Sequence, residues 1–412
     1  VIYHVDRTTP VAAVVLWYNV GSKHEQARRT GFAHLFEHMM FQGSEHVPDT
    51  QHIAHVERAG GNVNGSTWLD RTNYFETLPA HQLELALWLE SDRMGFFLPA
   101  LTQEKLDNQR DVVKNERRER VDNQPYGDWD ERIQRLLFPP DHPYHHSVIG
   151  SMADLDAASL DDVRAFFSTY YAPNNAVLSV VGDFDPAEAR RLVERYFGPI
   201  PRGPELPPLP GRPALEPFAL GREVREVVEG SFALARVYLA YRVPPFGSDD
   251  FYAVDVLTEV LSAGKSSRMY RDLVRDRRVA RSAAAFAFPV VTGAALLVVR
   301  GVAPPGGDVA GLEEALLAEL RSLAEDGPTA AELERALTGV EARNTLELQR
   351  VAERADRLSM HTTLFGEPER INTELDRYRA VTPADVRRVA GRYLREDNRV
   401  VLTYLPRVEV AA

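Results

Sequence analysis

Residues 30–41 read TGFAHLFEHMMF, and this stretch is the most informative part of the chain. Its apolar residues recur at helical spacing, so it predicts an amphipathic helix with Thr30 as N-cap and Gly43 as stop. Positions i, i+3 and i+4 of a helix share a face, which directs His34, Glu37 and His38 to one place. Two imidazoles one turn apart can hold a zinc ion, and a carboxylate beside them can accept a proton from water.

The plain alternative is that these polar residues serve packing only. An accidental H-x-x-E-H in a chain of this composition has a chance on the order of a few per cent, so the motif needs support from elsewhere. The surrounding residues are apolar and suited to burial. Buried polar groups need partners, and a metal ion would supply one for all three.

A third ligand is expected, because a catalytic zinc ion usually has three protein ligands and a water. A helix is predicted after Thr102, and its apolar stripe consists of Leu106, Gln109, Val112, Val113 and Glu116. Glu116 stands where an apolar residue is expected, which makes it the best candidate. Glu119, one turn further on, could orient Glu116 or simply face solvent.

The sequence around Glu116, RDVVKNE at 110–116, together with the histidine motif resembles the pitrilysin/insulinase family of zinc peptidases. Further stretches are family-like. GGNVNGST at 60–67 resembles the family's glycine-rich edge strand, and HPY at 142–144 and YAPNN at 171–175 resemble the end of its first domain. The match covers nearly the whole chain and is closest to bacterial members of this length that are similar to mitochondrial processing peptidase. Gln109 departs from the pattern, because several relatives have a second glutamate there.

The resemblance implies a set of roles. One zinc ion per chain would be held by His34, His38 and Glu116, and Glu37 would be the general base. Gln109 and Glu119 are then candidates for supporting the ligands. Substrate would lie extended along the edge strand near Asn62 to Thr67, with Asn64, Gly65 and Ser66 as candidate contacts. Asn64 could equally be a turn-forming residue, because glycine follows it.

Composition excludes several function classes. With 44% hydrophobic and 26% charged residues the chain is typical of a globular protein, and no apolar run approaches the roughly 20 residues of a membrane helix. A net charge of -12 argues against nucleic acid or an anionic membrane as partner. Without cysteine there are no disulfides, thiolate nucleophiles or cysteine-ligated zinc sites. A periplasmic location after removal of a leader is favoured over a cytoplasmic one.

The chain divides into two similar halves. Residues 199–217 are too rich in proline for a helix or a central strand and predict a stiff linker between domains at 1–198 and 218–412. Across the linker, Asp162 recurs as Asp385 and Asn175 as Asn398, each 223 positions later. We therefore predict a duplicated α+β protein, in which each half packs helices on an antiparallel-rich sheet. By resemblance, the two halves form half of a clamshell.

The duplication provides an internal control for the histidine motif. One residue out of that register, residues 256–260 read VLTEV and lie opposite HLFEH at 34–38. The second half keeps an apolar helix there without histidines at the metal positions. Packing in this fold therefore does not require imidazoles, which favours a metal role for His34 and His38.

The second half also lacks a feature of self-sufficient relatives, whose arginine and tyrosine grip substrate across the cleft. The corresponding positions here are Val274 and Arg281. By resemblance to two-chain members of the family, we therefore favour a zinc endopeptidase that acts on peptides or unfolded segments in a dimeric chamber, with a homologous partner chain supplying the arginine and tyrosine. A homodimer is the next alternative. A non-catalytic scaffold subunit and a zinc hydrolase for other substrates remain as rival functions.

Overall fold

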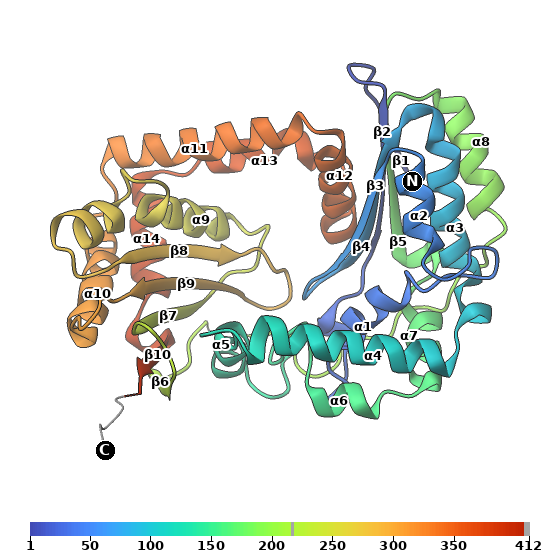
Figure 1. Ribbon diagram of the computed structural model, residues 1–412. Helices are drawn as coiled ribbons and strands as arrows, with labels where there is room; N and C mark the ends of the chain where they lie inside the picture. The colour runs from blue at the N-terminus through green and yellow to red at the C-terminus, as the bar shows by residue number, and fades with distance from the viewer. Residues whose placement is uncertain (216–217, 408–412) are drawn as a thin grey trace. The chain divides into compact units, whose positions relative to one another are not determined.

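The computed structural model describes residues 1–215 and 218–407, which form two compact units. Unit 1 consists of Val1–Glu119, His146–Pro210 and Thr345–Asn372. Unit 2 consists of Arg120–His145, Gly211–Asn344 and the chain from Thr373 on. Each unit is built around one five-stranded sheet (Figure 1).

The sheet of unit 1 has the strand order β1-β5-β2-β4-β3. Its strands are β1 Ile2–Val5, β2 Val11–Tyr18, β3 Asn62–Thr67, β4 Thr72–Pro79 and β5 Ala176–Gly182. The pairs are antiparallel apart from β1 with β5. The predicted strand at residues 62–67 therefore forms, and β3 lies at an edge of the sheet, paired on one side with β4.

Both faces of this sheet are covered by helices, as the alternation along β2 shows. Val14 and Leu16 point into the larger core with α1 and α3, whereas Val15 and Trp17 point to the other face. That second face packs against α12. The helices of unit 1 are α1 Phe32–Met39, α2 Gln51–Arg58, α3 Leu83–Ala100, α4 Gln103–Arg117, α6 Met152–Ala157, α7 Leu160–Tyr170, α8 Pro186–Phe197 and α12 Val351–Phe365.

Unit 2 repeats the plan with the strand order β6-β10-β7-β9-β8. Its strands are β6 Val224–Gly230, β7 Arg236–Val243, β8 Ser282–Phe288, β9 Ala295–Val302 and β10 Arg399–Pro406. Helices α9 Asp249–Ser262, α10 Val309–Glu325 and α14 Pro383–Tyr393 pack together and against the sheet, as does α5 Trp129–Leu137. Helices α11 Ala330–Leu348 and α13 Arg370–Arg379 carry the chain between the units.

Each unit therefore contains one helix from the opposite half of the sequence. Helix α12 follows most of unit 2 in the chain, yet it packs on β2 and β5 of unit 1. Helix α5 follows much of unit 1, yet it packs on β7 and β10 of unit 2. The predicted proline-rich linker has no helix or strand from 201 to 215, and the chain leaves unit 1 after Pro210. Residues 216 and 217 of this linker lie outside the described residues.

Equivalent hydrogen bonds in the two units confirm the duplicated α+β fold. Asp162 closes a capping box at the start of α7, and Asp385 does the same for α14. Asn175 Nδ2 donates to the carbonyl of Tyr170 at 2.8 Å, and Asn398 Nδ2 donates to that of Tyr393 at 2.8 Å. Both asparagines are buried and bridge a helix end to the sheet, so the repeated residues have repeated structural roles.

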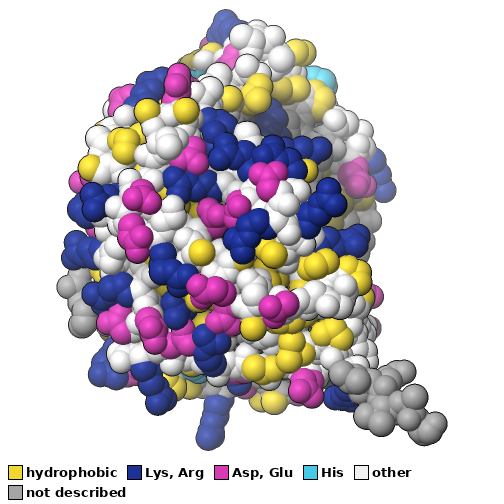
Figure 2. Space-filling model, turned by 90° about the vertical axis from the view of Figure 1, so that its left-hand side faces the viewer, with side chains coloured by type: hydrophobic (Ala, Val, Ile, Leu, Met, Phe, Trp, Pro, Cys, Tyr) yellow, Lys and Arg dark blue, Asp and Glu magenta, His cyan; other side chains and the backbone are white. Residues whose placement is uncertain are grey.

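No helix in the described parts of the chain is long and apolar enough to cross a membrane. Figure 2 shows the face that lies on the left in Figure 1. Acidic and basic side chains are interspersed there, with hydrophobic side chains scattered among them. On this face the net negative charge of the chain is therefore not gathered into one acidic surface.

Candidate metal centre

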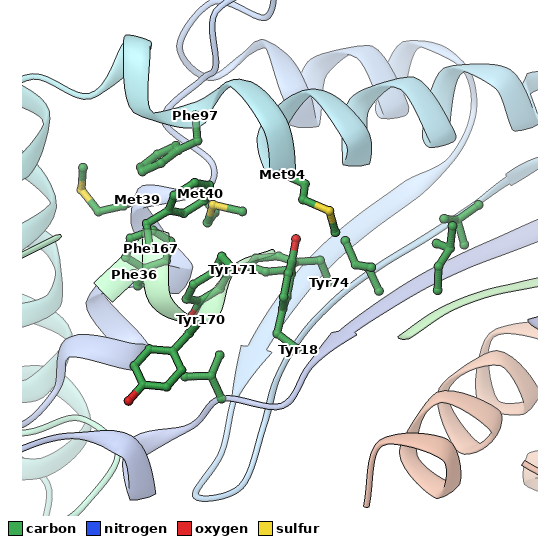
Figure 3. Close-up of a cluster of buried hydrophobic side chains, with 14 of the residues drawn as sticks. Tyr18, Phe36, Met39, Met40, Tyr74, Met94, Phe97, Phe167, Tyr170 and Tyr171 are labelled. Carbon is green, nitrogen blue, oxygen red and sulfur yellow. The ribbon is translucent and has the colours of Figure 1, made fainter. Parts of the chain in front are cut away.

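Helix α1 is fixed in the core by its apolar face. Phe36 packs against Phe97 of α3, with ring centroids 5.4 Å apart, and against Tyr171, with centroids 4.4 Å apart (Figure 3). Met39 is fully buried in the same cluster. Because this face is occupied, the polar side chains of His34, Glu37 and His38 are left only partly buried. The predicted amphipathic helix is confirmed.

The start of α1 differs from the prediction. Thr30 is not the N-cap; Gly31 occupies that position with φ of 87°, and it offers no side chain to cap the helix. The carboxylate of Glu25 takes that role, accepting the N–H of Gly31 at 2.8 Å and of Ala33 at 2.7 Å. Burial raises the pKa of Glu25 to about 8, while these N–H donors favour its charged form. Thr30 instead donates its hydroxyl to Asp154 at 2.5 Å.

Helix α4 begins as predicted, because the Thr102 side chain accepts the N–H of Lys105. Leu106, Gln109 and Val113 are buried, but Val112 is 39% exposed. The predicted stripe was therefore too wide at Val112, because adjacent helical positions point about 100° apart and the buried face is narrow.

The three predicted ligands come together. Glu116 Oε2 lies 3.2 Å from His38 Nε2 and 3.6 Å from His34 Nε2. The candidate ligand atoms of the three residues all lie within 4.8 Å of one another. Ligands about 2.0–2.1 Å from a tetrahedral zinc ion are roughly 3.3 Å apart, so these side chains fit such an ion with small adjustments. The donor set of two imidazoles and one carboxylate is also one that zinc accepts.

Glu37 stands beside this group without belonging to it. Burial raises the pKa of its carboxyl. The neighbouring Thr67 hydroxyl and the nearby charge of Arg71 act in the opposite direction. A carboxylate held in this way next to the ligands can receive a proton.

The candidate substrate residues lie on β3. Asn64 Oδ1 accepts the N–H of Gly65 at 2.8 Å, and both residues lie within the strand, so Asn64 is not a turn-forming residue. The Ser66 hydroxyl donates to Asn73 Oδ1 at 2.7 Å, and its carbonyl accepts from Arg71 at 2.7 Å. The polar groups of Ser66 are thus already engaged within the sheet.

The two residues considered as supports for the ligands differ in burial. Gln109 is buried, with 7% of its surface exposed. Glu119 is exposed and lies in the short π-helical segment, Arg118–Asp122, that follows α4. Neither residue is in the group formed by His34, His38 and Glu116.

Sequence reasoning missed Glu25 and Arg71. Glu25 lies six residues before Gly31, outside the spacing of any capping motif, so only the fold brings it to the helix. Arg71 follows the β3–β4 turn, and nothing in the local pattern shows that its charge acts on Glu37.

A second cluster of similar residues lies deeper in unit 1. His52, Glu76 and Glu90 are buried, with candidate ligand atoms within 4.8 Å of one another. His52 Nε2 lies 2.9 Å from Glu76 Oε1, and Arg93 Nε donates to Glu90 at 2.9 Å. The guanidinium of Arg93 also lies 4.0 Å from the centre of the Tyr74 ring.

Charge balance indicates that this cluster holds a proton and not a metal ion. Arg93 neutralises one of the two buried carboxylates, so one negative charge in the cluster is left to be balanced. Burial raises the pKa of both carboxyls and lowers that of His52. One proton on the two carboxyls makes the buried group neutral, whereas a divalent ion would give it an excess positive charge away from solvent.

Comparison with known proteins agrees with this geometry. Residues 1–135 match the family described as insulinase, peptidase family M16, and residues 157–340 match the peptidase M16 inactive domain. The zinc protease PqqE of Helicobacter pylori is 31% identical over 331 residues, which are 80% of this chain and 73% of that protein. The mitochondrial-processing peptidase subunit beta of Lentinula edodes is 24% identical over 93% of this chain and 83% of its own.

The fold has solved counterparts. The crystal structure of a protease from Helicobacter pylori superimposes with a TM-score of 0.91, at 27% identity, over 98% of this chain and 97% of that chain. The first half of the periplasmic protease PqqL from Escherichia coli superimposes with a TM-score of 0.74, at 20% identity, over 98% of this chain and 89% of that chain. This second likeness concerns the fold alone.

The metal site can be tested by composition. We expect purified, metal-replete protein to contain about one zinc ion per chain, because three ligand side chains converge. The His34→Ala, His38→Ala double variant should lose it. A His4→Ala, His81→Ala double variant, in which two exposed histidines of unit 1 are removed, should keep it. Elemental analysis with undiminished zinc in the first variant would rule out this site.

The buried proton can be tested by stability against pH. The pKa of Glu76 is raised to about 7 in the folded protein, from an ordinary value of 4.5. Its stabilising contribution is therefore complete below pH 4.5 and is lost as the pH rises through 7. Glu76→Gln removes the titration. Urea unfolding at pH 5.5 and pH 8 should show the wild type losing about 1–3 kcal/mol more than this variant. Equal losses would contradict the buried proton.

Proposed function

Because the chain belongs to the insulinase family of peptidases, M16, we propose that it is a zinc-dependent endopeptidase that cleaves peptides or unfolded segments. The observation that carries the proposal is the convergence of His34, His38 and Glu116 beside a carboxylate that is not a ligand. Relatives named as zinc proteases support the choice of metal.

The residues divide the chemistry between them. A zinc ion bound by the three ligands would supply Lewis acidity, which acidifies water and polarises the carbonyl of the scissile bond. Glu37 takes the proton of the attacking water and passes it to the leaving amine. The neighbouring Thr67 hydroxyl favours the charged form of Glu37, which is the form that accepts a proton.

The edge strand offers a place for the substrate backbone. β3 pairs with β4 on one side, so its other side presents N–H and C=O groups to an incoming peptide. Asn64 and Gly65 lie in the middle of this strand, and Ser66 is tied to Arg71 and Asn73. An extended peptide added here would be bound through its backbone, with weak dependence on its sequence.

We further propose that the chain works with a homologous partner. Val274 and Arg281 stand where self-sufficient relatives have an arginine and a tyrosine. Nearby Arg268 does not replace that arginine, because it is bound to Glu332 at 2.8 Å. A partner chain that carries the pair would complete a closed chamber, and a homodimer is the second arrangement.

The rival function is a non-catalytic scaffold subunit. The missing arginine and tyrosine favour it, whereas the complete set of His34, Glu37, His38 and Glu116 argues against it. A peptidase assay on a pool of mixed oligopeptides, with this chain alone and with co-purifying chains, distinguishes the two functions. No cleavage by zinc-loaded protein under either condition would support the scaffold.

The assignment of Glu37 as base can be tested by one substitution. Glu37→Gln keeps the size of the side chain and removes the proton acceptor, so it should retain zinc and lose peptidase activity by about 100-fold or more. Glu104→Gln, the same chemical change at an exposed position of α4, should leave both properties unchanged. Full activity in Glu37→Gln would sink the assignment.

The need for a partner can be tested by measuring mass and rate together. Size-exclusion chromatography with light scattering gives the mass, and a peptidase assay on the same samples gives the rate. We expect the isolated chain to be weakly active, and the addition of a homologous chain with the arginine and tyrosine to raise both the mass and the rate. A monomer that cleaves peptides at full rate with nothing added would show this proposal to be wrong.

A further inference from the structure

The candidate centre depends on the spacing of two helices. His34 and His38 share α1, so the helix itself sets their separation. Glu116 lies on α4, more than seventy residues later in the chain. Binding sites generally require their ligands to be held to within about 0.5 Å, so something must fix α4 relative to α1.

The segment 150–158 touches the start of α1 at very close range. Gly150 and Gly31 both have positive φ, of 70° and 87°. A Cβ added at Gly150 would lie 2.3 Å from the nitrogen of Gly31 and 2.4 Å from its Cα. On either side of this contact, the N–H of Ser151 donates to the Thr30 hydroxyl at 3.1 Å, and Thr30 donates to Asp154.

The same segment holds α4 along one face. Arg110, Lys114 and Arg117 follow each other at spacings of four and three residues, so they share a face of the helix. Arg110 donates to the carbonyl of Ala158 at 2.6 Å, and Lys114 donates to Asp156 at 2.5 Å. Arg117, directly after the ligand Glu116, donates to the carbonyl of Gly150 at 2.7 Å.

We propose that Gly150 and Arg117 are positioning residues for the metal centre, which set the distance between the ligand-bearing ends of α1 and α4. Because Gly150 has no side chain, its backbone can contact the start of α1 directly. Its carbonyl accepts a hydrogen bond from Arg117 of α4. The two contacts meet at a single peptide segment. A displacement there moves Glu116 relative to His34 and His38. This inference rests on the metal site of the proposed function and adds the residues that hold its geometry.

The glycine can be tested against a matched control. Gly150→Ala introduces a Cβ into the contact with Gly31 and also the strain of positive φ. Gly366, which ends α12 in the same unit, has φ of 72° and nothing within 4 Å of an added Cβ. Gly366→Ala therefore carries the strain without the contact. We expect Gly150→Ala to bind zinc about 10–100-fold more weakly in chelator competition, and Gly366→Ala to bind it as the wild type does.

The arginine provides a second variant if Gly150→Ala does not fold. Arg117→Met keeps the length of the side chain and removes its bond to Gly150. Arg118→Met is the control, because Arg118 is exposed and donates to Asn115 within its own helix. We expect weaker zinc binding and an altered cobalt absorption spectrum for Arg117→Met, with both unchanged for Arg118→Met.

The readouts separate this inference from the proposed function. Wild-type affinity and an unaltered cobalt spectrum in folded Gly150→Ala and Arg117→Met would overturn the positioning role and leave the peptidase proposal intact. Wild-type protein that binds zinc but cleaves no peptide would overturn the peptidase proposal, and the positioning role would still be decided by the metal measurements.

Discussion

The burial of one face of α1 is the constraint on which the rest of the site depends. Phe36 and Met39 are enclosed by side chains of α3 and α7 in a core packed at the density of a solid. A rotation of α1 by one residue would turn its side chains by about 100° and would expose these two residues to water. The core therefore fixes which side of α1 faces outward. Apolar packing on the opposite face of the helix therefore fixes the direction in which the two histidines point.

The second unit shows that this helix is needed for the fold but its histidines are not. α9 has Val256, Leu257 and Val260 in the corresponding region, all fully buried. Unit 2 also keeps the hydrogen bonds that are repeated from unit 1, including the capping box at Asp385 and the bond from the buried Asn398. The same architecture is thus stable without imidazoles, so the polar residues on α1 have no evident role in packing. A function in binding is the remaining physical reason for placing them in an apolar frame.

Much of the fold and of the site could be predicted from local patterns. The helix that carries His34, Glu37 and His38 follows from spacing, although it ends at Met39 and not near Gly43, and so does the helix after Thr102. The edge strand at 62–67 was expected from the family resemblance. The capping by Glu25 could not be predicted, because a carboxylate distant from the usual capping positions reaches α1 only in the folded chain. The packing of α5 on the sheet of unit 2 and of α12 on the sheet of unit 1 could not be predicted either. An apolar stripe shows which face of a helix is buried, but it does not show which sheet covers that face.

Two clusters of imidazole and carboxylate groups in one unit have different chemistry for reasons that residue type alone does not reveal. The side chains of His34, His38 and Glu116 are only partly buried, so an ion can reach them from solvent. Beside Glu76, the cation is supplied by Arg93 from within the core, and a proton completes the balance. A cation in fixed position removes the electrostatic reason to bind another. The location of Arg93, set by helix α3, therefore gives the inner group a charge balance of its own, which agrees with the proposal that a metal ion binds the outer group on α1 and α4.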